Sequence, residues 1–182
     1  MKVIHFEDAK VTEWSGGKTH ELLIHPENSN FKSGDYDLRM SVATVNLEET
    51  TFTSLPGVNR ILTVLEGKLM LTHEGHHTVK LGPYEQDRFQ GDWTTKSKGK
   101  VRDFNVMWKN GSATVECHRI SPGTTKKMEA FSGIRYFFIV SGEAVFTSNE
   151  LQKFDMGIVE NGSIATFKES CTFLEIKYIS AP

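Results

Sequence analysis

Apolar residues in this chain recur in short alternating runs that are separated by turn signals. The clearest run spans residues 37–45 and divides between two faces, one formed by Leu38, Met40, Val42 and Thr44 and the other by Arg39, Ser41, Ala43 and Val45. A period of two over this length predicts a β-strand. No stretch has a clear helical period, and turn signals recur about every 8–12 residues. The pattern therefore predicts an all-β fold.

One segment of the chain is repeated. Residues 59–71 resemble residues 134–146 without a gap, and the same offset aligns further positions. The matched pairs are Arg60 with Arg135, Gly67 with Gly142, Gly82 with Gly157, and residues 39–45 with residues 114–120. A repeat of this kind indicates a duplicated structural unit.

The repeated unit, a strand, a glycine turn and a second strand after a Pro-Gly pair, resembles a cupin jelly roll. We therefore expect a bicupin, that is, two packed jelly-roll or cupin-like β-barrels from an internal repeat. The N-terminal cupin-like half would span residues 1–110 and carry the candidate ligand pocket. The C-terminal cupin-like half would span residues 111–182 and pack tightly on the first, so that the two form a single compact unit.

The first half offers the better ligand chemistry. If one face of two strands points inward, a barrel interior holds a cation, a hydroxyl, a carboxylate and an amide, namely Arg39, Ser41, Asp103, Asn105 and Met107. Such a mixture can fix a small polar molecule by hydrogen bonds. Arg39 is either a structural ion-pair member or a ligand-binding arginine. A one-residue register error would reverse the assignment of faces.

Cupins usually hold a metal with histidines and a glutamate, and that resemblance can be tested on this sequence. When the last glycine of the cupin motif is laid on Gly67, the glutamate position falls on Arg60 and the histidine positions contain no histidine. In the second half the glutamate position falls on Arg135. A guanidinium repels a divalent ion and suits a carboxylate. We expect an anion rather than a metal, unless Arg60 simply pairs with a neighbouring Asp or Glu.

Other candidate groups carry less weight. His73, His76 and His77 could approach one another and bind zinc or copper, but we interpret them as an exposed hairpin tip without a carboxylate ligand. Cys117 and Cys171 could form one disulfide, but we favour two buried free thiols, because a chain of this size does not need a disulfide. No nucleophile elbow or phosphate-binding loop is present.

Composition limits the classes of partner. The chain has 182 residues, is 38% hydrophobic and carries a net charge of −2, which gives no field for nucleic acid or an anionic membrane. No apolar run is long enough for a signal peptide or a membrane span. We expect a cytoplasmic monomer or homodimer that binds neither nucleic acid nor membrane and uses no cofactor or metal.

Five ordered motifs resemble the HutD/Ves family: residues 14–19, 37–45, 52–60, 89–92 and 103–107. The resemblance implies a bicupin without established enzymatic activity. It further implies sensing or binding of a histidine-utilisation intermediate such as formylglutamate, or a stress-induced role. The family's usual Asp before the arginine is Asn59 here.

We therefore predict a binding protein for a small carboxylate, such as an acylated amino acid, with a regulatory or stress-related metabolic role. Arg60 or Arg39 would hold the carboxylate, and Ser41, Asp103 and Asn105 would orient it. Loops at Thr19 and from Phe89 to Asp92 would close the mouth of the pocket. The alternatives are a cupin enzyme, either metal-dependent or a metal-free isomerase or hydrolase using Asp103, and a structural interaction module.

Overall fold

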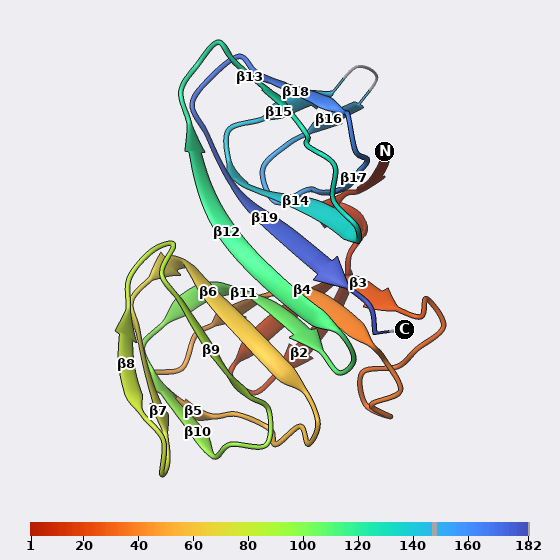
Figure 1. The fold of residues 1–182 in the computed structure, drawn as a ribbon. Coiled ribbons are helices and arrows are strands. Elements are labelled where there is room, and N and C mark those ends of the chain that lie inside the picture. Colours follow the sequence, from red (N-terminus) through yellow and green to blue (C-terminus); the bar gives the residue numbers. More distant parts are fainter. Residues whose placement is uncertain (147–148, 182) are drawn as a thin grey trace. The chain divides into compact units, whose positions relative to one another are not determined.

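The computed structural model describes residues 1–146 and 149–181. Its elements are antiparallel strands and one short 3-10 helix, η1 (Phe6–Asp8). The chain divides into two compact units (Figure 1). We call Lys10–Asn110 the N-terminal unit, and Met1–Ala9 together with Gly111–Pro182 the C-terminal unit. Among the described residues, no helix has the length and apolar character needed to cross a membrane.

The N-terminal unit consists of two sheets. The six-stranded sheet has the order β2 (Lys10–Trp14), β3 (Gly17–His25), β4 (Leu38–Val45), β11 (Val101–Trp108), β6 (Asn59–Gly67) and β9 (Gln86–Gln90). The four-stranded sheet has the order β5 (Glu49–Thr51), β10 (Thr95–Lys98), β7 (Leu69–His73) and β8 (Thr78–Leu81). Both sheets contribute to one apolar core, formed by Val45, Leu62, Val64, Leu69, Leu71, Leu81, Phe89 and Val101.

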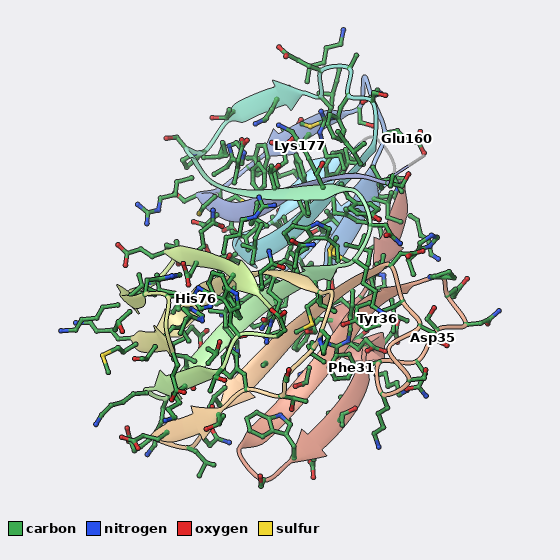
Figure 2. The ribbon with its side chains drawn as sticks, turned by 60° about the horizontal axis from the view of Figure 1, so that its bottom comes forward. Phe31, Asp35, Tyr36, His76, Glu160 and Lys177 are labelled. Atoms are coloured by element: carbon green, nitrogen blue, oxygen red, sulfur yellow. The ribbon has the colours of Figure 1, made fainter. Side chains whose placement is uncertain are left out.

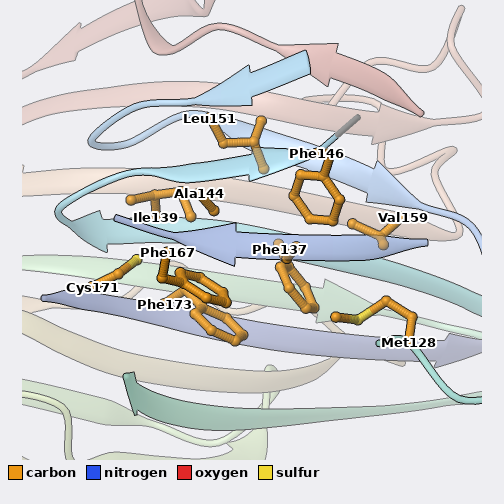
Figure 3. Packing of buried hydrophobic residues seen from close by; sticks show 11 residues of the cluster. Met128, Phe137, Ile139, Ala144, Phe146, Leu151, Val159, Phe167, Cys171 and Phe173 are labelled. Atoms are coloured by element: carbon orange, nitrogen blue, oxygen red, sulfur yellow. The ribbon is translucent and has the colours of Figure 1, made fainter. Parts of the chain in front are cut away.

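The C-terminal unit has the same two-sheet design. Its five-stranded sheet has the order β1 (Lys2–Ile4), β17 (Met156–Val159), β14 (Ile134–Ser141), β19 (Cys171–Ile179) and β12 (Ser112–Ile120). Its four-stranded sheet has the order β13 (Thr124–Lys127), β18 (Ile164–Phe167), β15 (Ala144–Phe146) and β16 (Asn149–Leu151). Aromatic side chains fill the space between the sheets, and Phe137 stacks on Phe173 with ring centroids 4.3 Å apart (Figure 3).

The two units share one topology. The strand order β9-β6-β11-β4 in the first corresponds to β17-β14-β19-β12 in the second, and β5-β10-β7-β8 corresponds to β13-β18-β15-β16. Arg60 and Arg135 occupy equivalent positions in β6 and β14, as the sequence repeat predicts. The all-β, bicupin-like fold is thereby confirmed.

A β-bulge occurs at the same place in the repeated strand of each unit, in β6 and in β14. Where β6 runs along β11, Leu65 has no partner in the register, and in β14 the unpartnered residue is Val140. Each bulge reverses the phase of the alternation, because one extra residue turns the following side chains to the other face. In the first unit Leu62 before the bulge and Leu69 after it consequently face the same core.

Three details differ from the expectations. Gly157 lies within β17 opposite Phe137, whereas Gly82 follows the end of β8, so these two glycines are not equivalent. The predicted division at residue 110 placed residues 1–9 with the first half, but β1 pairs with β17 in the C-terminal unit. Both cysteines are free, and Cys117 is exposed rather than buried.

Candidate functional site

Three neighbouring strands of the N-terminal unit place polar side chains on one face. β11 lies between β4 and β6, and the register sets Met107 opposite both Arg39 and Arg60. Because residues two apart share a face of a strand, the same face collects the other polar residues of these strands. We call this set the polar face, and its buried members are Arg39, Ser41, Arg60, Asp103, Asn105 and Met107.

Arg39 has a close counterion. Its Nε donates to Glu21 Oε2 over 2.6 Å, and its Nη1 donates to Ser41 Oγ over 3.2 Å. The guanidinium also lies over the ring of Phe31, 4.1 Å from its centroid. A buried charge is stable when it is paired and hydrogen-bonded. Of the two roles that the sequence left open for Arg39, the geometry favours the structural ion pair.

Arg60 has no counterion in contact among the described residues. Its Nη2 donates to Asn105 Oδ1 over 2.8 Å, and its Nε is buried without a hydrogen-bond partner. The guanidinium carbon lies 4.8 Å from the ring centroid of Phe52 and 4.9 Å from that of Phe89. Burial lowers the pKa of Arg60 to about 10, so the side chain is still a cation at neutral pH. Because its close neighbours are a neutral amide and two aromatic rings, this cation can still bind an anion.

Asp103 continues the hydrogen-bond chain from Arg60. Asn105 Nδ2 donates to Asp103 Oδ1, so the amide links the cation to the carboxyl group. Burial raises the pKa of Asp103 to about 7, although the charge of Arg60 and the hydrogen bond from Asn105 both oppose this rise. Asp103 therefore titrates near neutrality instead of supplying a full counter-charge.

The residues expected to close the pocket lie elsewhere. Thr19 was expected in a loop, but it belongs to β3 and pairs with Thr12 and Ala43. Phe89 was also expected in a loop, but it lies in β9, where it pairs with Arg60 and is buried. Asp92 is exposed in the turn that follows β9. The predicted loops are therefore wrong for Thr19 and Phe89, which lie in strands, whereas Asp92 does lie in a turn. Phe89 contacts the guanidinium of Arg60.

Sequence reasoning missed the side chains that surround the two arginines. Glu21, the partner of Arg39, comes from β3, and Phe31 and Tyr36 come from the segment between β3 and β4 (Figure 2). Tyr36 is buried, and its hydroxyl lies 4.0 Å from the sulfur of Met107. Phe52 covers Arg60 from an irregular segment after β5. These contacts depend on the tertiary fold, and the alternation of residues within single strands does not indicate them.

The histidine cluster matches the predicted exposed hairpin tip only in part, because His76 and His77 are exposed but His73 is not. His73 is buried, and its Nε2 lies 2.8 Å from Asp87 Oδ2. His77 Nε2 lies 3.0 Å from the same oxygen. The carboxylate that the sequence pattern lacked is thus supplied by β9.

The C-terminal unit uses the equivalent arginine differently. Arg135 Nε lies 2.8 Å from Glu175 Oε1, and both side chains are buried. Glu175 occupies the position of Asn105, because it pairs with Phe137 as Asn105 pairs with Leu62. Burial raises the pKa of Glu175, but a hydrogen bond from His118 and the charges of Lys177 and Lys126 outweigh it and hold this pKa down at about 2. Arg135 therefore has an internal counterion, although its Nε and Nη1, like the Nε of Arg60, make no hydrogen bond of good geometry within the described part of the chain.

The C-terminal unit also has an open surface depression of about 570 Å³. Its lining residues are Lys127, Met128, Glu129, Ala130, Asn161 and Gly162. Asn161 is already used to bind the backbone of Phe131 on both its amide atoms. The charged residues of its lining, Lys127 and Glu129, are both exposed, so the polar face of the N-terminal unit is the better candidate site.

The comparisons with known proteins decide the family. The family model described as HutD matches residues 6–173. The chain belongs to the HutD family. Among solved structures, HutD from Pseudomonas fluorescens SBW25 aligns with a TM-score of 0.74 and 22% identity over 98% of this chain and 99% of that one. A conserved protein of unknown function from Pseudomonas aeruginosa PAO1 aligns with a TM-score of 0.80 and 20% identity over 98% of both chains.

A more distant similarity extends to an enzyme. The oxalate decarboxylase of Lactobacillus farciminis, solved as a formate complex, aligns with this HutD-family chain with a TM-score of 0.72 and 11% identity. The alignment covers 98% of this chain and 88% of that one. This likeness supports the shared fold.

The metal usually held by cupins does not fit the residues at the corresponding positions of this HutD-family protein. Arg60 and Arg135 stand where a carboxylate ligand would be, and both are buried cations. A divalent ion beside either guanidinium would be repelled at close range. We derive no chemistry through a metal at these positions.

Proposed function

We propose that the N-terminal unit binds a small carboxylate through Arg60. The observation that carries the proposal is a buried guanidinium that contacts no carboxylate among the described residues, whose Nε also has no hydrogen-bond partner there and whose Nη2 donates to the neutral Asn105. Leaving a buried donor unsatisfied costs about 1–3 kcal/mol, and more for a charged group. A carboxylate that reaches Arg60 would satisfy this donor and supply the missing counter-charge.

The comparison between the two units supports the same conclusion. In the C-terminal unit the equivalent arginine, Arg135, is neutralised by Glu175. In the N-terminal unit the residue at the Glu175 position is Asn105, a shorter side chain that carries an amide instead of a charge. Under this proposal a ligand supplies to Arg60 what Glu175 supplies to Arg135, and the C-terminal unit serves as a structural partner.

The other members of the polar face would orient the ligand. Asn105 and Ser41 offer an amide and a hydroxyl, and Asp103 in its protonated form offers a donor to a ligand oxygen. Arg39 acts as a positioning residue, since Glu21 already occupies its Nε. Phe52 and Phe89 provide apolar walls for the remainder of the molecule.

An acylated amino acid of the formylglutamate type suits this mixture of groups. Its carboxylates match a guanidinium fork, and its amide matches the hydroxyl and amide donors. The relative from Pseudomonas fluorescens was determined in a formate condition, and the distant oxalate decarboxylase as a formate complex. Formate is therefore a sensible minimal probe, and the cellular role of such binding would be regulatory or stress-related.

The test is a thermal-shift screen followed by calorimetry with formate, glutamate, formylglutamate and urocanate. A ligand that binds only the folded state raises the melting temperature by mass action. Arg60→Gln should weaken binding by about 2–5 kcal/mol, because a buried charged contact is lost. Arg60→Lys should bind more weakly than wild type, because the bidentate fork is lost.

A matched control is Arg88→Lys, which changes an exposed arginine on the neighbouring strand β9. It should bind as wild type does. The proposal fails if no carboxylate in the panel shifts the melting temperature, or if Arg60→Gln and Arg88→Lys bind equally well.

A second candidate is metal-free acid–base catalysis on such a ligand. The observation that favours it is Asp103, whose pKa of about 7 matches that of an efficient general base at neutral pH. Product analysis of the bound acids after prolonged incubation separates the two candidates. Turnover that is lost in Asp103→Asn supports the enzyme, and unchanged ligand supports pure binding.

A further inference from the structure

We infer that His73, His77 and Asp87 form a binding site for a divalent transition metal, with Zn²⁺ as the best-fitting ion. The three side chains converge from β7, from the β7–β8 turn and from β9. One ligand atom from each lies within 4.8 Å of the other two. This site is distinct from the polar face and does not depend on carboxylate binding there.

The hairpin that carries the histidines holds them opposite each other. The His73 N–H donates to the His77 carbonyl over 2.8 Å, and the His76 N–H donates to the His73 carbonyl over 3.0 Å. Gly75 closes the turn with a φ of +78°. The two imidazole rings consequently lie side by side, with centroids 4.6 Å apart. The backbone therefore fixes two nitrogen ligands before any ion binds.

Asp87 completes a set of two imidazoles and one carboxylate. Its Oδ2 lies 2.8 Å from His73 Nε2 and 3.0 Å from His77 Nε2. Ligand atoms around tetrahedral zinc at about 2.0 Å are roughly 3.3 Å from one another, so a displacement of about half an ångström admits the ion. Two histidines and a carboxylate leave one coordination position for water.

The hydrogen bond behind His73 fits a metal ligand. Its Nδ1 lies 2.8 Å from Thr95 Oγ1, and this hydroxyl donates its proton to the Trp93 carbonyl over 3.3 Å. With the hydroxyl in this orientation the Thr95 oxygen accepts the Nδ1 proton, which directs the Nε2 lone pair of a neutral His73 toward Asp87. In the metal-free protein a proton lies between Nε2 and Asp87 Oδ2, and a bound metal ion would take its place. A support of this kind behind a metal-ligating histidine is the usual arrangement in metalloproteins.

The surroundings of the cluster allow an ion to enter and to stay. The His77 side chain is 40% exposed and that of Asp87 is 14% exposed, so the open position can be reached from solvent. Both ion-pair partners of Asp87 among the described residues are histidines, so no Lys or Arg competes with the metal.

The C-terminal unit offers an internal comparison. Its cluster of Glu116, His118 and Glu175 also brings three ligand atoms within 4.8 Å of one another. Arg135, however, lies 2.8 Å from Glu175, and Lys126 and Lys177 each lie 3.8 Å from it. These cations already form ion pairs with the Glu175 carboxylate and would repel a metal ion. The ligand atoms of the two clusters are therefore similarly spaced, but their surroundings differ. Lys and Arg side chains contact the carboxylate in the C-terminal cluster, whereas histidines contact it in the N-terminal cluster.

The histidine hairpin is also an addition specific to the N-terminal unit. Leu69 in β7 pairs with Leu81, twelve positions later, whereas the equivalent Ala144 pairs with Leu151, only seven positions later. The extra length extends the β7–β8 hairpin and contains both histidine ligands. The shared fold does not need this extension, which is consistent with a separate task.

The test measures metal binding to the untagged, metal-stripped full chain at neutral pH. We expect one Zn²⁺ per chain by calorimetry, and with Co²⁺ a visible absorption band typical of tetrahedral coordination. His77→Ala and Asp87→Asn should each weaken Zn²⁺ binding by roughly 100-fold or more. Thr95→Val should weaken it by about 10–100-fold through loss of the support behind His73.

The matched control is His76→Ala, which removes the neighbouring histidine that stacks on Trp93 rather than facing Asp87. It should retain the stoichiometry and the absorption band of wild type. Circular dichroism would establish that each variant is folded. The inference is overturned if wild type binds no stoichiometric Zn²⁺ at micromolar concentration, or if Asp87→Asn and His76→Ala bind it equally.

Discussion

Asp103 should give the stability of this protein a pH dependence opposite to that of an ordinary surface carboxylate. Burial raises its pKa from 3.8 to about 7 in the folded chain. The folded state then binds the proton more tightly than the unfolded state does. Its contribution favours folding at low pH and is lost progressively as the pH rises from about 4 to about 7.

The size of this effect follows from the two pKa values. Linkage between a folded pKa of about 7 and an unfolded pKa near 3.8 removes about 2.5 kcal/mol of stability between pH 5 and pH 8. Asp103→Asn cannot titrate and escapes this loss. The free energy of unfolding of the variant, relative to wild type, should therefore rise by about 2.5 kcal/mol over the same range. For a chain of this size that corresponds to a relative gain of roughly 5–10 °C in Tm.

The assay is urea-induced unfolding followed by circular dichroism at the two pH values, with thermal scans in parallel. Asp92→Asn is the matched control, because it makes the same chemical change in an exposed turn. Its curve should stay parallel to that of wild type. Parallel curves for Asp103→Asn as well would mean that Asp103 is ionised at neutral pH. Arg60 would then already have an internal counter-charge, and the physical basis of the carboxylate site would be lost.

Three further substitutions test two ion pairs and one glycine at which two strands approach closely. Glu21→Gln leaves Arg39 buried beside a neutral amide and should cost about 3–5 kcal/mol by urea unfolding; a loss below about 1 kcal/mol would show that the pair is dispensable. Gly67→Ala places a Cβ at 2.5 Å from the Lys100 carbonyl oxygen at a φ of +91° and should cost about 1–3 kcal/mol in the same assay, so a neutral result would contradict the close approach. Glu175, with a pKa lowered to about 2 from 4.5, stabilises the fold above that ordinary value, and the contribution disappears as the pH falls toward 2. Thermal scans of Glu175→Gln should accordingly show a flatter acid limb than wild type, and an equally steep limb would refute the assignment.

The fold could be predicted from the sequence because two independent patterns agreed. The alternation in residues 37–45 identified β4 and its two faces, and the repeat of Arg60 at Arg135 indicated two units of the same topology. The loops were harder to predict from the sequence. A loop was predicted at Thr19, but this residue and the nearby Gly17 lie in β3, where a Cβ added to Gly17 would stand only 1.8 Å from the Thr44 carbonyl oxygen. This glycine permits the close approach of two strands, which a turn signal does not distinguish.

Only the part of the candidate site that depends on the alternation of side chains within one strand could be predicted. The common face of Asp103, Asn105 and Met107 follows from their spacing within one strand. The pairing of Arg39 with Glu21 depends on the register between β3 and β4, which shifts between Glu21 and Leu23. A bulge of this kind leaves no mark in the hydrophobic pattern. Asp87 was missed for a related reason, because only the tertiary fold brings β9 beside the β7–β8 turn.

The bulges at Leu65 and Val140 indicate which segments of the chain can tolerate insertions or deletions and which cannot. The β7–β8 hairpin is five positions longer than its counterpart, and the fold absorbs the difference because a hairpin tip has no inward face to preserve. A single residue lost at Leu65 would instead turn Leu69 and Leu71 away from the core. Length variation among proteins built on this plan should therefore accumulate at the hairpin tips and be absent between Arg60 and Leu71. New side chains, and with them new binding properties, can be added at the tips without disturbing the strands that hold Arg60.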